Sequence, residues 1–450
     1  MIKDNYVIEP EKKIPVCFET DVLVVGAGPG GHAAAVAAAR AGADVVLLER
    51  YGHLGGMATG GLVTMIHSMS DGTNNIVIRG QCEEWLERLR KWDALDVPDY
   101  DQIGTEYKTV GRGRFNGPFF RTEGKLIYGA RTDSEILKVV LNDMAEEAGV
   151  KVLLHALVTD VIIENGKLKG VIFESKSGRQ AVLAKTIIDG SGDGDVFARA
   201  GCDFASTLDA PNRLANPALC IEFGNVDWDR NEAYRASHEK EYEELMKRLE
   251  EIDGFRMHFR TIWLRESVCH FNMFLKGYDV LKVEDLTRLE FDVRRRMMTT
   301  YEFYRENIPG FEDCFIMITA PQVGVRGSRI LEGRHKLTET EARAGTKFED
   351  TVCEFPPLRG NYPENPHVFI PFSCLMTKEF DNLLVAGRTF SSDEVVNEHF
   401  NTISHCIMMG QATGTAGALA AKSGVAAVDI DTAEIRKTLI KDGVLFPGFD

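Results

Sequence analysis

The chain has 450 residues, of which 44% are apolar, 27% charged and 9% aromatic. These values are ordinary for globular proteins, so they exclude a disordered, collagen-like or coiled-coil chain, and the length allows about three domains. Lysine and arginine number 52 against 68 aspartates and glutamates, which gives a net charge of −16. Because a negative chain repels phosphate backbones, nucleic acid is not expected as the main partner.

Nine cysteines are scattered along the chain without a CxxC or other zinc-like spacing. This pattern argues against a metal site, an iron–sulfur cluster or a disulfide scaffold, and it is typical of reduced thiols in a cytoplasmic protein. Residues 1–15 are charged and lack the apolar core of a signal peptide. No uncharged apolar run reaches about 18 residues, so we expect no membrane span and a cytoplasmic location.

A strand–turn–helix–strand unit is predicted near the start of the chain. The apolar run Asp21–Val25 has the composition of a buried parallel strand, and a glycine-rich turn follows it at residues 26–31. The alanine-rich segment Ala33–Ala41 is typical of a helix. A second buried strand, Asp44–Leu48, ends on Glu49.

Residues 62–200 mix helices with a predicted β-meander, in which Asn165-Gly166 is a typical hairpin turn. The predicted elements are a helix over Gln81–Asp93, a basic loop over 111–124, a helix over Ser134–Ala148 capped by Asp133 or Ser134, a strand over Val150–Leu154, meander strands over Leu157–Glu164, Leu168–Ser175 and Ala181–Leu183, and a last apolar run over Thr186–Asp189.

From about residue 205 the pattern changes, which indicates an inserted domain. Charged helices are predicted over Asp229–Glu251 and Val283–Glu306, a strand over 382–388, and a helix rich in glycine and alanine over Asn401–Ser423. We therefore divide the chain into the N-terminal part of a nucleotide-binding domain (1–204, with a loop or cap segment at 62–130), an inserted substrate domain (205–375) and the C-terminal part of the first domain (376–450).

The GxGxxG turn after the first strand is the strongest chemical signal. Gly26 suits a tight turn, Gly28 lets a diphosphate approach the backbone, and Gly31 lets the helix pack against the strand. Glu49 follows Gly26 by 23 residues and is placed to accept hydrogen bonds from both ribose hydroxyls and to repel a 2′-phosphate. The sequence therefore predicts a dinucleotide other than NADP, and a purely structural glycine turn is the alternative.

Three further segments carry a family resemblance. They are RYGHLGGMATGG after Glu49, TIIDGSGDGD at residues 186–195, and DNLLVAGR followed by MMGQATGTAGALAA near the C-terminus. The three segments resemble FAD-dependent oxidoreductases of the glutathione-reductase-like superfamily, relatives of fumarate reductase and succinate dehydrogenase flavoproteins. The resemblance covers about residues 20–65, 130–200 and 380–425, and it leaves out the inserted domain, where substrate is chosen.

The resemblance implies FAD as cofactor and an α/β fold, with a Rossmann-like FAD-binding domain, a three-stranded β-meander and an inserted α+β substrate domain. Many relatives have Gly-Asp, which holds the ribityl chain, where this chain has Gly387-Arg388; this departure points to a subfamily rather than to another cofactor. The residues expected at the cofactor are Gly26, Gly28, Pro29, Gly30, Gly31, Glu49, Arg50, Gly55, Gly56, Met57, Thr59, Gly60, Val158, Gly190, Gly192, Asp193, Gly387, Arg388 and Thr402.

Two histidines are candidates for the reaction centre. A flavin carries the hydride chemistry, so the protein must supply substrate orientation, an acid or base, and charge stabilisation. His399, in a loop expected over residues 388–401, is the first candidate for the acid or base, with Asn401 and Glu398 as partners. The alternative is that His399 only binds the flavin or caps a helix. His67 either lines the reactive face of the flavin or is an ordinary core histidine.

Arginines are candidates for binding a substrate carboxylate, as the fumarate-reductase-like resemblance implies. Arg326 and Arg329 form a basic pair after the strand-like run Cys314–Ala320, and Arg112 and Arg114 are weaker candidates in the basic loop. Surface or interdomain ion pairs are the alternative for all four arginines.

The helix predicted from Asn401 has two interpretations. Its N-terminal N–H groups are expected to face the flavin pyrimidine edge and favour the anionic reduced flavin. Gly410, Gly414 and Gly417 suit close packing, either on the cofactor or, as we favour, on another helix.

The sequence thus predicts an FAD-dependent oxidoreductase that transfers a hydride between flavin N5 and a small organic substrate, with carboxylates as one candidate class. The alternatives are a non-redox flavin-dependent isomerase or hydratase, an aromatic monooxygenase, and an FAD-binding scaffold subunit without turnover. A second GxGxxG unit for NAD(P)H is absent from the sequence. The electron partner is therefore open between oxygen, a quinone, a carrier protein, and NAD(P)H entering the substrate pocket. A homodimer through the inserted domain is a further hypothesis.

Overall fold

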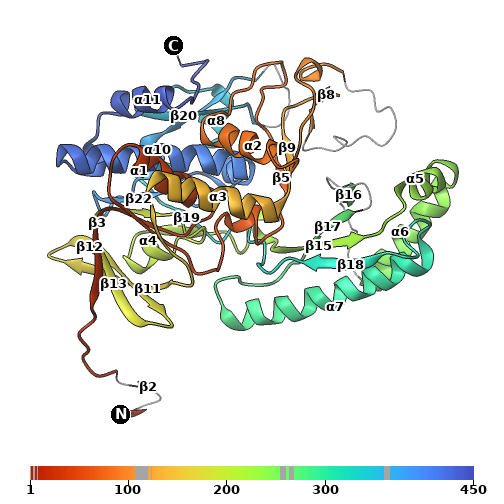
Figure 1. Cartoon of the computed structure of the whole chain (residues 1–450), viewed down its shortest axis with the longest axis horizontal. Helices are drawn as coiled ribbons and strands as arrows, with labels where there is room; N and C mark the ends of the chain where they lie inside the picture. Colours follow the sequence, from red (N-terminus) through yellow and green to blue (C-terminus); the bar gives the residue numbers. More distant parts are fainter. Residues whose placement is uncertain are drawn as a thin grey trace.

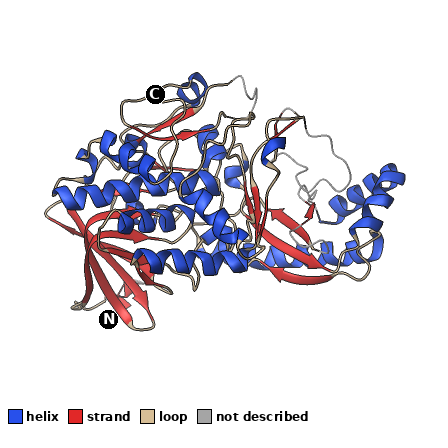
Figure 2. Cartoon of the chain, turned by 45° about the horizontal axis from the view of Figure 1, so that its top comes forward, coloured by secondary structure: helices blue, strands red, loops and turns tan. Residues whose placement is uncertain are grey.

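The computed structural model describes residues 2–3, 6–7, 9–106, 120–122, 124–253, 260–262, 268–358 and 365–449. A larger α/β part carries both ends of the chain, and a smaller part, formed by a second sheet and the helices packed on it, extends from its side (Figure 1). In Figure 2 the meander strands project at one end of the molecule, and the sheet of the smaller part lies toward the other end.

The larger part is built on a seven-stranded sheet with the order β10-β4-β3-β13-β12-β11, and β22 also pairs with β13. Its parallel strands are β3 (Val16–Val25), β4 (Val45–Leu48), β10 (Lys151–Leu153), β13 (Gly178–Asp189) and β22 (Leu383–Val385), and its antiparallel meander is β11 (Leu157–Glu164), β12 (Lys167–Ser175) and the first half of β13. The predicted α/β fold with a three-stranded meander is confirmed.

The carboxyl ends of four parallel strands lie level with one another. Val25 at the end of β3 pairs with Leu48 on one side and with Asp189 on the other, and Asp189 also pairs with Val385. Open parallel sheets bind ligands at this edge, because the loops that leave the strands meet there. The register therefore brings together the four turns that begin at Gly26, Glu49, Gly190 and Ala386.

Two helices, α1 (Pro29–Arg40) and α10 (Ile403–Ser423), pack backbone to backbone above this sheet (Figure 1). A Cβ atom on Gly410 would lie 2.0 Å from the carbonyl oxygen of Gly30, and one on Gly414 would lie 2.1 Å from that of Ala34. Gly410 and Gly414 therefore serve the contact between helices, as we favoured from the sequence.

The smaller part has a four-stranded antiparallel sheet with the order β16-β17-β15-β18. Side chains alternate across β15, so Leu219, Ile221 and Phe223 share one face and Cys220 and Glu222 share the other. All of these except Glu222 belong to the hydrophobic core that also contains residues of the long helix α7. The bounds are β15 (Ala218–Gly224), α5 (Trp228–Ser237), α6 (Glu239–Asp253), β16 (Arg260–Ile262), β17 (Cys269–Phe274), α7 (Val283–Asn307) and β18 (Phe315–Thr319).

The remaining elements complete the larger part and the connections. They are β1 (Ile2–Lys3), β2 (Tyr6–Val7), η1 (Gly56–Ala58), β5 (Met65–Ile66), α2 (Gln81–Arg90), β6 (Leu95–Asp96), η2 (Tyr100–Gln102), β7 (Arg121–Thr122), β8 (Lys125–Leu126), β9 (Ala130–Thr132), α3 (Ser134–Ala148), α4 (Asp195–Arg199), β14 (Phe204–Ser206), η3 (Arg213–Ala215), β19 (Arg329–Leu331), α8 (Glu339–Ala344), β20 (Thr351–Phe355), β21 (Val368–Pro371), η4 (Phe372–Leu375), α9 (Glu394–Phe400), η5 (Ala427–Asp429) and α11 (Thr432–Lys441).

Four local predictions were wrong. The charged helix over 229–251 is two helices, because His238 leaves the helical region at φ −131° and ψ 43°. The runs 181–183 and 186–189 are one continuous strand, β13. The loop expected over 388–401 contains α9, whose first turn is capped by the Asp393 side chain. The last long helix begins at Ile403 rather than Asn401, which ends α9.

The three-part division of the chain remains a prediction. The hydrophobic cores indicate which residues pack with the smaller part and which pack with the larger part. The core of the smaller part gathers residues between Leu219 and Val323. Val352, Phe355 and Ile370 belong instead to the core that contains α1 and α10. Among the described residues, no helix is long and apolar enough to cross a membrane, and no group of three or more His, Cys, Asp or Glu side chains is arranged to hold a metal ion.

Candidate cofactor site and substrate cavity

The glycine-rich turn is held by close contacts between backbones. Gly26 has φ +89° and donates from its N–H to the Leu48 carbonyl at 2.7 Å. A Cβ atom on Gly31 would lie 1.8 Å from the Gly26 carbonyl oxygen, and one on Gly30 would lie 3.0 Å from the Ala386 backbone. Glycine is therefore needed at these positions for packing, since any side chain there would push the helix away from the sheet.

Gly28 differs from the other glycines of the turn. Its φ of −63° suits any residue, and a Cβ atom there would meet nothing within 4 Å. The open space lies at the start of α1, where Pro29 begins the helix and no side chain caps the first turn. Free N–H groups of a helix N-terminus attract phosphate. Gly28 thus leaves room where a diphosphate would approach the backbone, which fits the FAD predicted from the sequence.

Glu49 is buried and fixed beside this turn. Its Oε2 accepts a hydrogen bond from the Ala27 N–H at 2.6 Å, and its Oε1 accepts one from the Tyr51 N–H at 2.8 Å. Each carboxylate oxygen keeps a second lone pair, so both can still accept from ribose hydroxyls. Val158 is buried nearby on β11, two positions after Ala156, whose N–H donates to the Glu49 carbonyl at 2.9 Å.

The second glycine cluster packs directly on the first. Gly55 has φ +94° and donates from its N–H to the Ala27 carbonyl at 2.8 Å. A Cβ atom on Gly56 would lie 2.9 Å from the Gly28 Cα. Thr59 Oγ1 donates to the Leu54 carbonyl at 2.6 Å and fixes the short helix η1. The extended glycine motif therefore runs beside the diphosphate cradle, as expected for an elongated cofactor.

Asp193 links the ends of β13 and β22. Its Oδ1 accepts hydrogen bonds from Arg388 Nη2 at 2.6 Å and from Ser328 Oγ at 2.8 Å, and its Oδ2 lies 3.8 Å from Arg50 Nη2. Burial acts to raise the pKa of the Asp193 carboxyl, but Arg388 and Arg50 lower it below its usual value. A Cβ atom on Gly192 would lie 3.2 Å from the Arg388 guanidinium.

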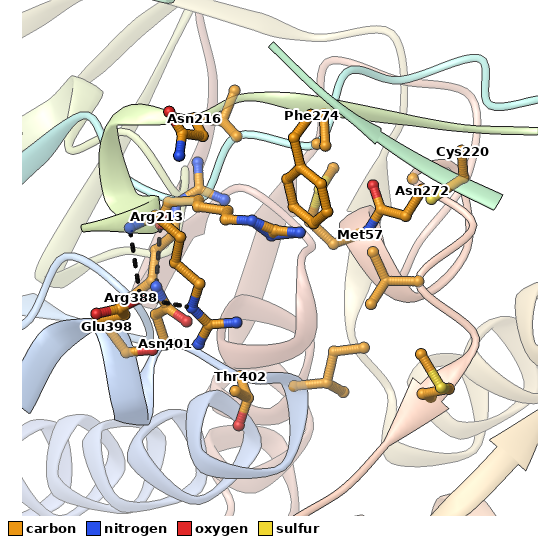
Figure 3. Close-up of a pocket in the computed structure, with 18 of the residues that line it drawn as sticks. Met57, Arg213, Asn216, Cys220, Asn272, Phe274, Arg388, Glu398, Asn401 and Thr402 are labelled. Carbon is orange, nitrogen blue, oxygen red and sulfur yellow. Dashed lines mark hydrogen bonds and ion pairs between the residues drawn. The ribbon is translucent and has the colours of Figure 1, made fainter. Parts of the chain in front are cut away.

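A cavity of about 960 Å³ lies between this edge of the sheet and the polar face of β15 and β17. Figure 3 shows Thr402 on one side of the cavity and Cys220, Asn272 and Phe274 on the other. The cavity brings together all four predicted catalytic residues and three predicted cofactor residues. These seven are His67, Arg326, His399, Asn401, Met57, Arg388 and Thr402.

The N-terminus of α10 joins the two walls of the cavity. Asn401 Nδ2 donates to the Arg326 carbonyl at 3.2 Å, and Thr402 occupies the N-cap of the helix. Ser404 Oγ donates to the His67 carbonyl at 2.8 Å, and His67 Nδ1 lies 2.9 Å from Ser68 Oγ. The start of α10 therefore fixes His67 from one side and the Arg326 backbone from the other.

Arg326 and Arg329 do not act as a pair. Arg326 reaches the cavity and lies over the Phe274 ring, with its Cζ 4.3 Å from the ring centroid. Arg329 instead donates to the Asp193 carbonyl at 2.7 Å and lies 3.3 Å from Asp195 Oδ1. Arg329 thus fits the ion-pair alternative rather than a place in the cavity. Arg112 and Arg114 lie outside the described residues.

The electrostatics of Arg326 are unusual for an arginine. Burial and the neighbouring Arg213 lower the pKa of its guanidinium to about 9. Its Nε is buried without a hydrogen-bond partner, and the described residues place no carboxylate at ion-pair distance from it. Arg213, by contrast, pairs with Glu398 at 3.1 Å.

Several cavity residues were not predicted from the sequence. They are Arg213, Asn216, Cys220, His270, Asn272, Phe274, Lys276 and Arg296. The alternation of polar and apolar letters in ALCIEFG and CHFNMF could have placed Cys220, His270 and Asn272 on one sheet face. The alternation could not have shown that this face lies across the cavity from residues that are far away in the chain, such as Met57 and His67.

The FAD dependent oxidoreductase family matches residues 21–439. The chain belongs to this family. The match runs through the predicted cofactor motifs and through the smaller part that the first resemblance did not cover.

Curated relatives match a shorter stretch. Digeranylgeranylglycerophospholipid reductase 2 of Methanopyrus kandleri is 30% identical over 175 residues, which are 39% of this chain and 38% of that protein. Thiamine thiazole synthase of Aeropyrum pernix is 34% identical over 155 residues, which are 34% of this chain and 44% of that protein. The chain thus matches less than half the length of these relatives.

Among solved structures, p-nitrophenol 4-monooxygenase PnpA of Pseudomonas putida DLL-E4 has a similar fold. The two chains are 12% identical, the similarity covers 94% of this chain and 86% of the other, and the TM-score is 0.50. At this identity the comparison shows the shared fold alone.

Proposed function

We propose that the protein oxidises or reduces a small organic carboxylate, which binds in the cavity with its carboxylate on Arg326. The observation that carries this proposal is the Arg326 side chain, a buried guanidinium in a large cavity with no carboxylate partner among the described residues. A buried charge without a counter-ion is costly, so such a group favours an anionic ligand. FAD, when bound, supplies hydride transfer at N5.

Two arginines near Arg326 already have carboxylate partners. Arg213 is neutralised by Glu398, and Arg388 is neutralised by Asp193. Arg326 is thus left to bind a carboxylate through its planar fork of donors. Phe274 packs under the guanidinium and restricts its orientation.

We assign the proton transfer to His399, with His67 as the alternative on the opposite wall. Both side chains line the cavity, and imidazole exchanges protons near neutral pH. Asn401 connects His399 to the Arg326 backbone, because it follows His399 by two positions and donates to the Arg326 carbonyl at 3.2 Å. This connection would hold the acid or base at a fixed distance from the bound carboxylate.

The test is an anaerobic titration of purified holoprotein with small carboxylates, alcohols, amines and sugars, followed by the visible flavin spectrum. We expect carboxylates to perturb or bleach the flavin, and Arg326→Gln to weaken their binding between about tenfold and a hundredfold. Arg235→Gln, on the exposed side of α5, is the matched control and should bind carboxylates as the native protein does. Bleaching by another class, with no response to carboxylates, would refute the proposal.

We further propose kinship with fumarate reductase flavoproteins, a cytoplasmic location and a homodimer through the inserted domain. The candidates for the electron partner are oxygen, a quinone, a carrier protein and NAD(P)H. Flavin that is bound but neither bleached nor reoxidised during turnover would favour the non-redox isomerase or hydratase.

A further inference from the structure

One wall of the cavity carries a cysteine and a histidine on adjacent strands, and a buried glutamate lies beside the histidine. In the β15–β17 ladder, Glu222 pairs with His270 and Cys220 pairs with Asn272. Residues two apart on a strand share a face, so Cys220 and His270 are diagonal neighbours on the polar face of the sheet. Cys220, His270 and Asn272 all line the cavity.

His270 is held in place by Glu222. Its Nδ1 lies 3.3 Å from Glu222 Oε1, and both residues are about as buried as core side chains, with 3% of their surfaces exposed. Burial acts to lower the pKa of His270, but its interactions with Cys220 and Glu222 raise it to about 10. The Cys220 sulfur and the Glu222 carboxylate on β15 thus both favour the protonated form of His270 on the neighbouring strand.

The charge balance of this wall involves Arg326 as well. Burial and Arg213 lower the pKa of the Arg326 guanidinium, and negative charge on Cys220 opposes that lowering. Arg326 and His270 are basic groups near the Cys220 sulfur, and Glu222 is the carboxylate that holds His270. A cysteine beside a histidine that a carboxylate holds in place is an arrangement in which a thiol acts as a nucleophile.

A polar atom nearby has no partner within the described chain. The Oδ1 atom of Asn272, directly across the ladder from Cys220, is buried without a hydrogen bond, as is the Nε atom of Arg326. Buried polar atoms are normally satisfied, so unpartnered ones on a cavity wall indicate a ligand with donors and acceptors of its own.

We propose that Cys220, oriented by His270 and Glu222, is a nucleophilic site for electrophilic carboxylates, above all acids whose carbon–carbon double bond is conjugated to a carbonyl group. The sulfur would attack the β-carbon, forming a carbon–sulfur bond as the carbon–carbon π bond breaks. The α-carbon would take a proton from His270, so no oxidant or reductant is consumed. The position of the carboxylate rests on the proposed function of Arg326, whereas the reactivity of the sulfur does not.

The test compares iodoacetate with iodoacetamide on purified holoprotein, with the alkylated peptides quantified by mass spectrometry. We expect Cys220 to be alkylated at about pH 6.5 at least about tenfold faster than Cys17, a partly exposed thiol whose pKa is raised by burial. Iodoacetate should react faster than iodoacetamide at Cys220 only, since its carboxylate binds near the sulfur. Cys314, buried in the same domain away from the cavity, is the second internal control.

Variants separate this inference from the proposed function. His270→Gln and Glu222→Gln should each slow alkylation of Cys220 at about pH 6.5 while leaving Cys17 unchanged, and a retained flavin spectrum shows that each variant is folded. Arg326→Gln should abolish the preference for iodoacetate but leave rapid alkylation by iodoacetamide. If Arg326→Gln still binds carboxylates as tightly as the native protein in the flavin titration, the proposed function of Arg326 is refuted, whereas the nucleophilic site at Cys220 is not. Alkylation of Cys220 no faster than that of Cys17, or unchanged in both the His270 and Glu222 variants, would overturn the nucleophilic site.

Discussion

Arg388 donates a hydrogen bond from Nη2 to Oδ1 of Asp193 at 2.6 Å, although the two residues are 195 positions apart in the chain. They follow β22 and β13, which run parallel and side by side. Ser328 donates to the same oxygen at 2.8 Å and ties the connection from the smaller part to this point. A carboxylate therefore lies at the end of β22 even though the chain itself has Gly387-Arg388 there.

Replacing Asp193 tests this contact. Asp193→Asn leaves Arg388 and Arg50 without their counter-charge in a largely buried position, so we expect it to lower the free energy of unfolding by about 3 kcal/mol. The control Ser328→Ala removes a single hydrogen bond and should cost about 1 kcal/mol. Both are measured by urea denaturation of purified protein. Equal effects of the two variants would show that the ion pair adds nothing beyond one hydrogen bond.

Alanine variants of Gly28 and Gly31 distinguish a glycine that makes room for the cofactor from a glycine that allows close packing. Gly28→Ala should fold with nearly native stability, because its Cβ meets nothing within 4 Å and its φ is −63°, but it should bind FAD more weakly. Gly31→Ala should fold poorly, because its Cβ would lie 1.8 Å from the Gly26 carbonyl oxygen. Thermal denaturation and the FAD content after reconstitution measure the two effects. Full FAD affinity in Gly28→Ala would argue that the diphosphate lies elsewhere.

His399→Gln tests the proton transfer. If His399 is the acid or base, turnover should fall about a hundredfold or more, while FAD content and substrate binding stay near native values. Rapid-reaction spectroscopy of the flavin, with the substrate class found by titration, measures the chemical step directly. Native turnover in His399→Gln, together with loss of turnover in His67→Gln, would show that His67 rather than His399 is the acid or base.

A second histidine site gives a prediction about stability and pH. His367 hydrogen-bonds to Glu354 through Nδ1 and lies 3.4 Å from Asp71 Oδ2 through Nε2. Burial acts to lower the pKa of His367, but the two carboxylates raise it to about 9. Its contribution to stability is therefore complete below about pH 6.5, the usual pKa of unfolded histidine, and is lost as the pH rises through about 9.

The stability difference between the native protein and His367→Gln should thus be largest near pH 6 and shrink steadily toward about pH 9.5. Urea denaturation across this range measures it. His238→Gln is the control, because His238 is exposed and 3.9 Å from Glu241, so it should show little difference at any pH. A difference for His367→Gln that grows with pH would contradict the assignment.

The sequence signals at the predicted cofactor edge are local. Gly26, Gly31 and Glu49 act within one strand–turn–helix–strand unit, whose geometry follows from short-range backbone constraints and from burial of the two strands. The helix α3 began at Ser134 with Asp133 as its cap, as predicted, since capping depends on neighbouring residues. The break at His238 was missed because no proline or glycine marks it.

The substrate side depended on contacts that only the tertiary structure makes. Arg326 and Arg329 have the same chemistry three positions apart, yet one reaches the cavity over Phe274 and the other binds at Asp193. Cys220 and His270 meet through strand pairing, and they line the same cavity as Thr402, which is about 180 positions later than Cys220 in the chain. The sequence by itself therefore determined the fold class and the FAD-binding turns, whose residues are neighbours in the chain. The tertiary structure decided which distant side chains share the cavity, because their positions follow from long-range packing rather than from any local backbone preference.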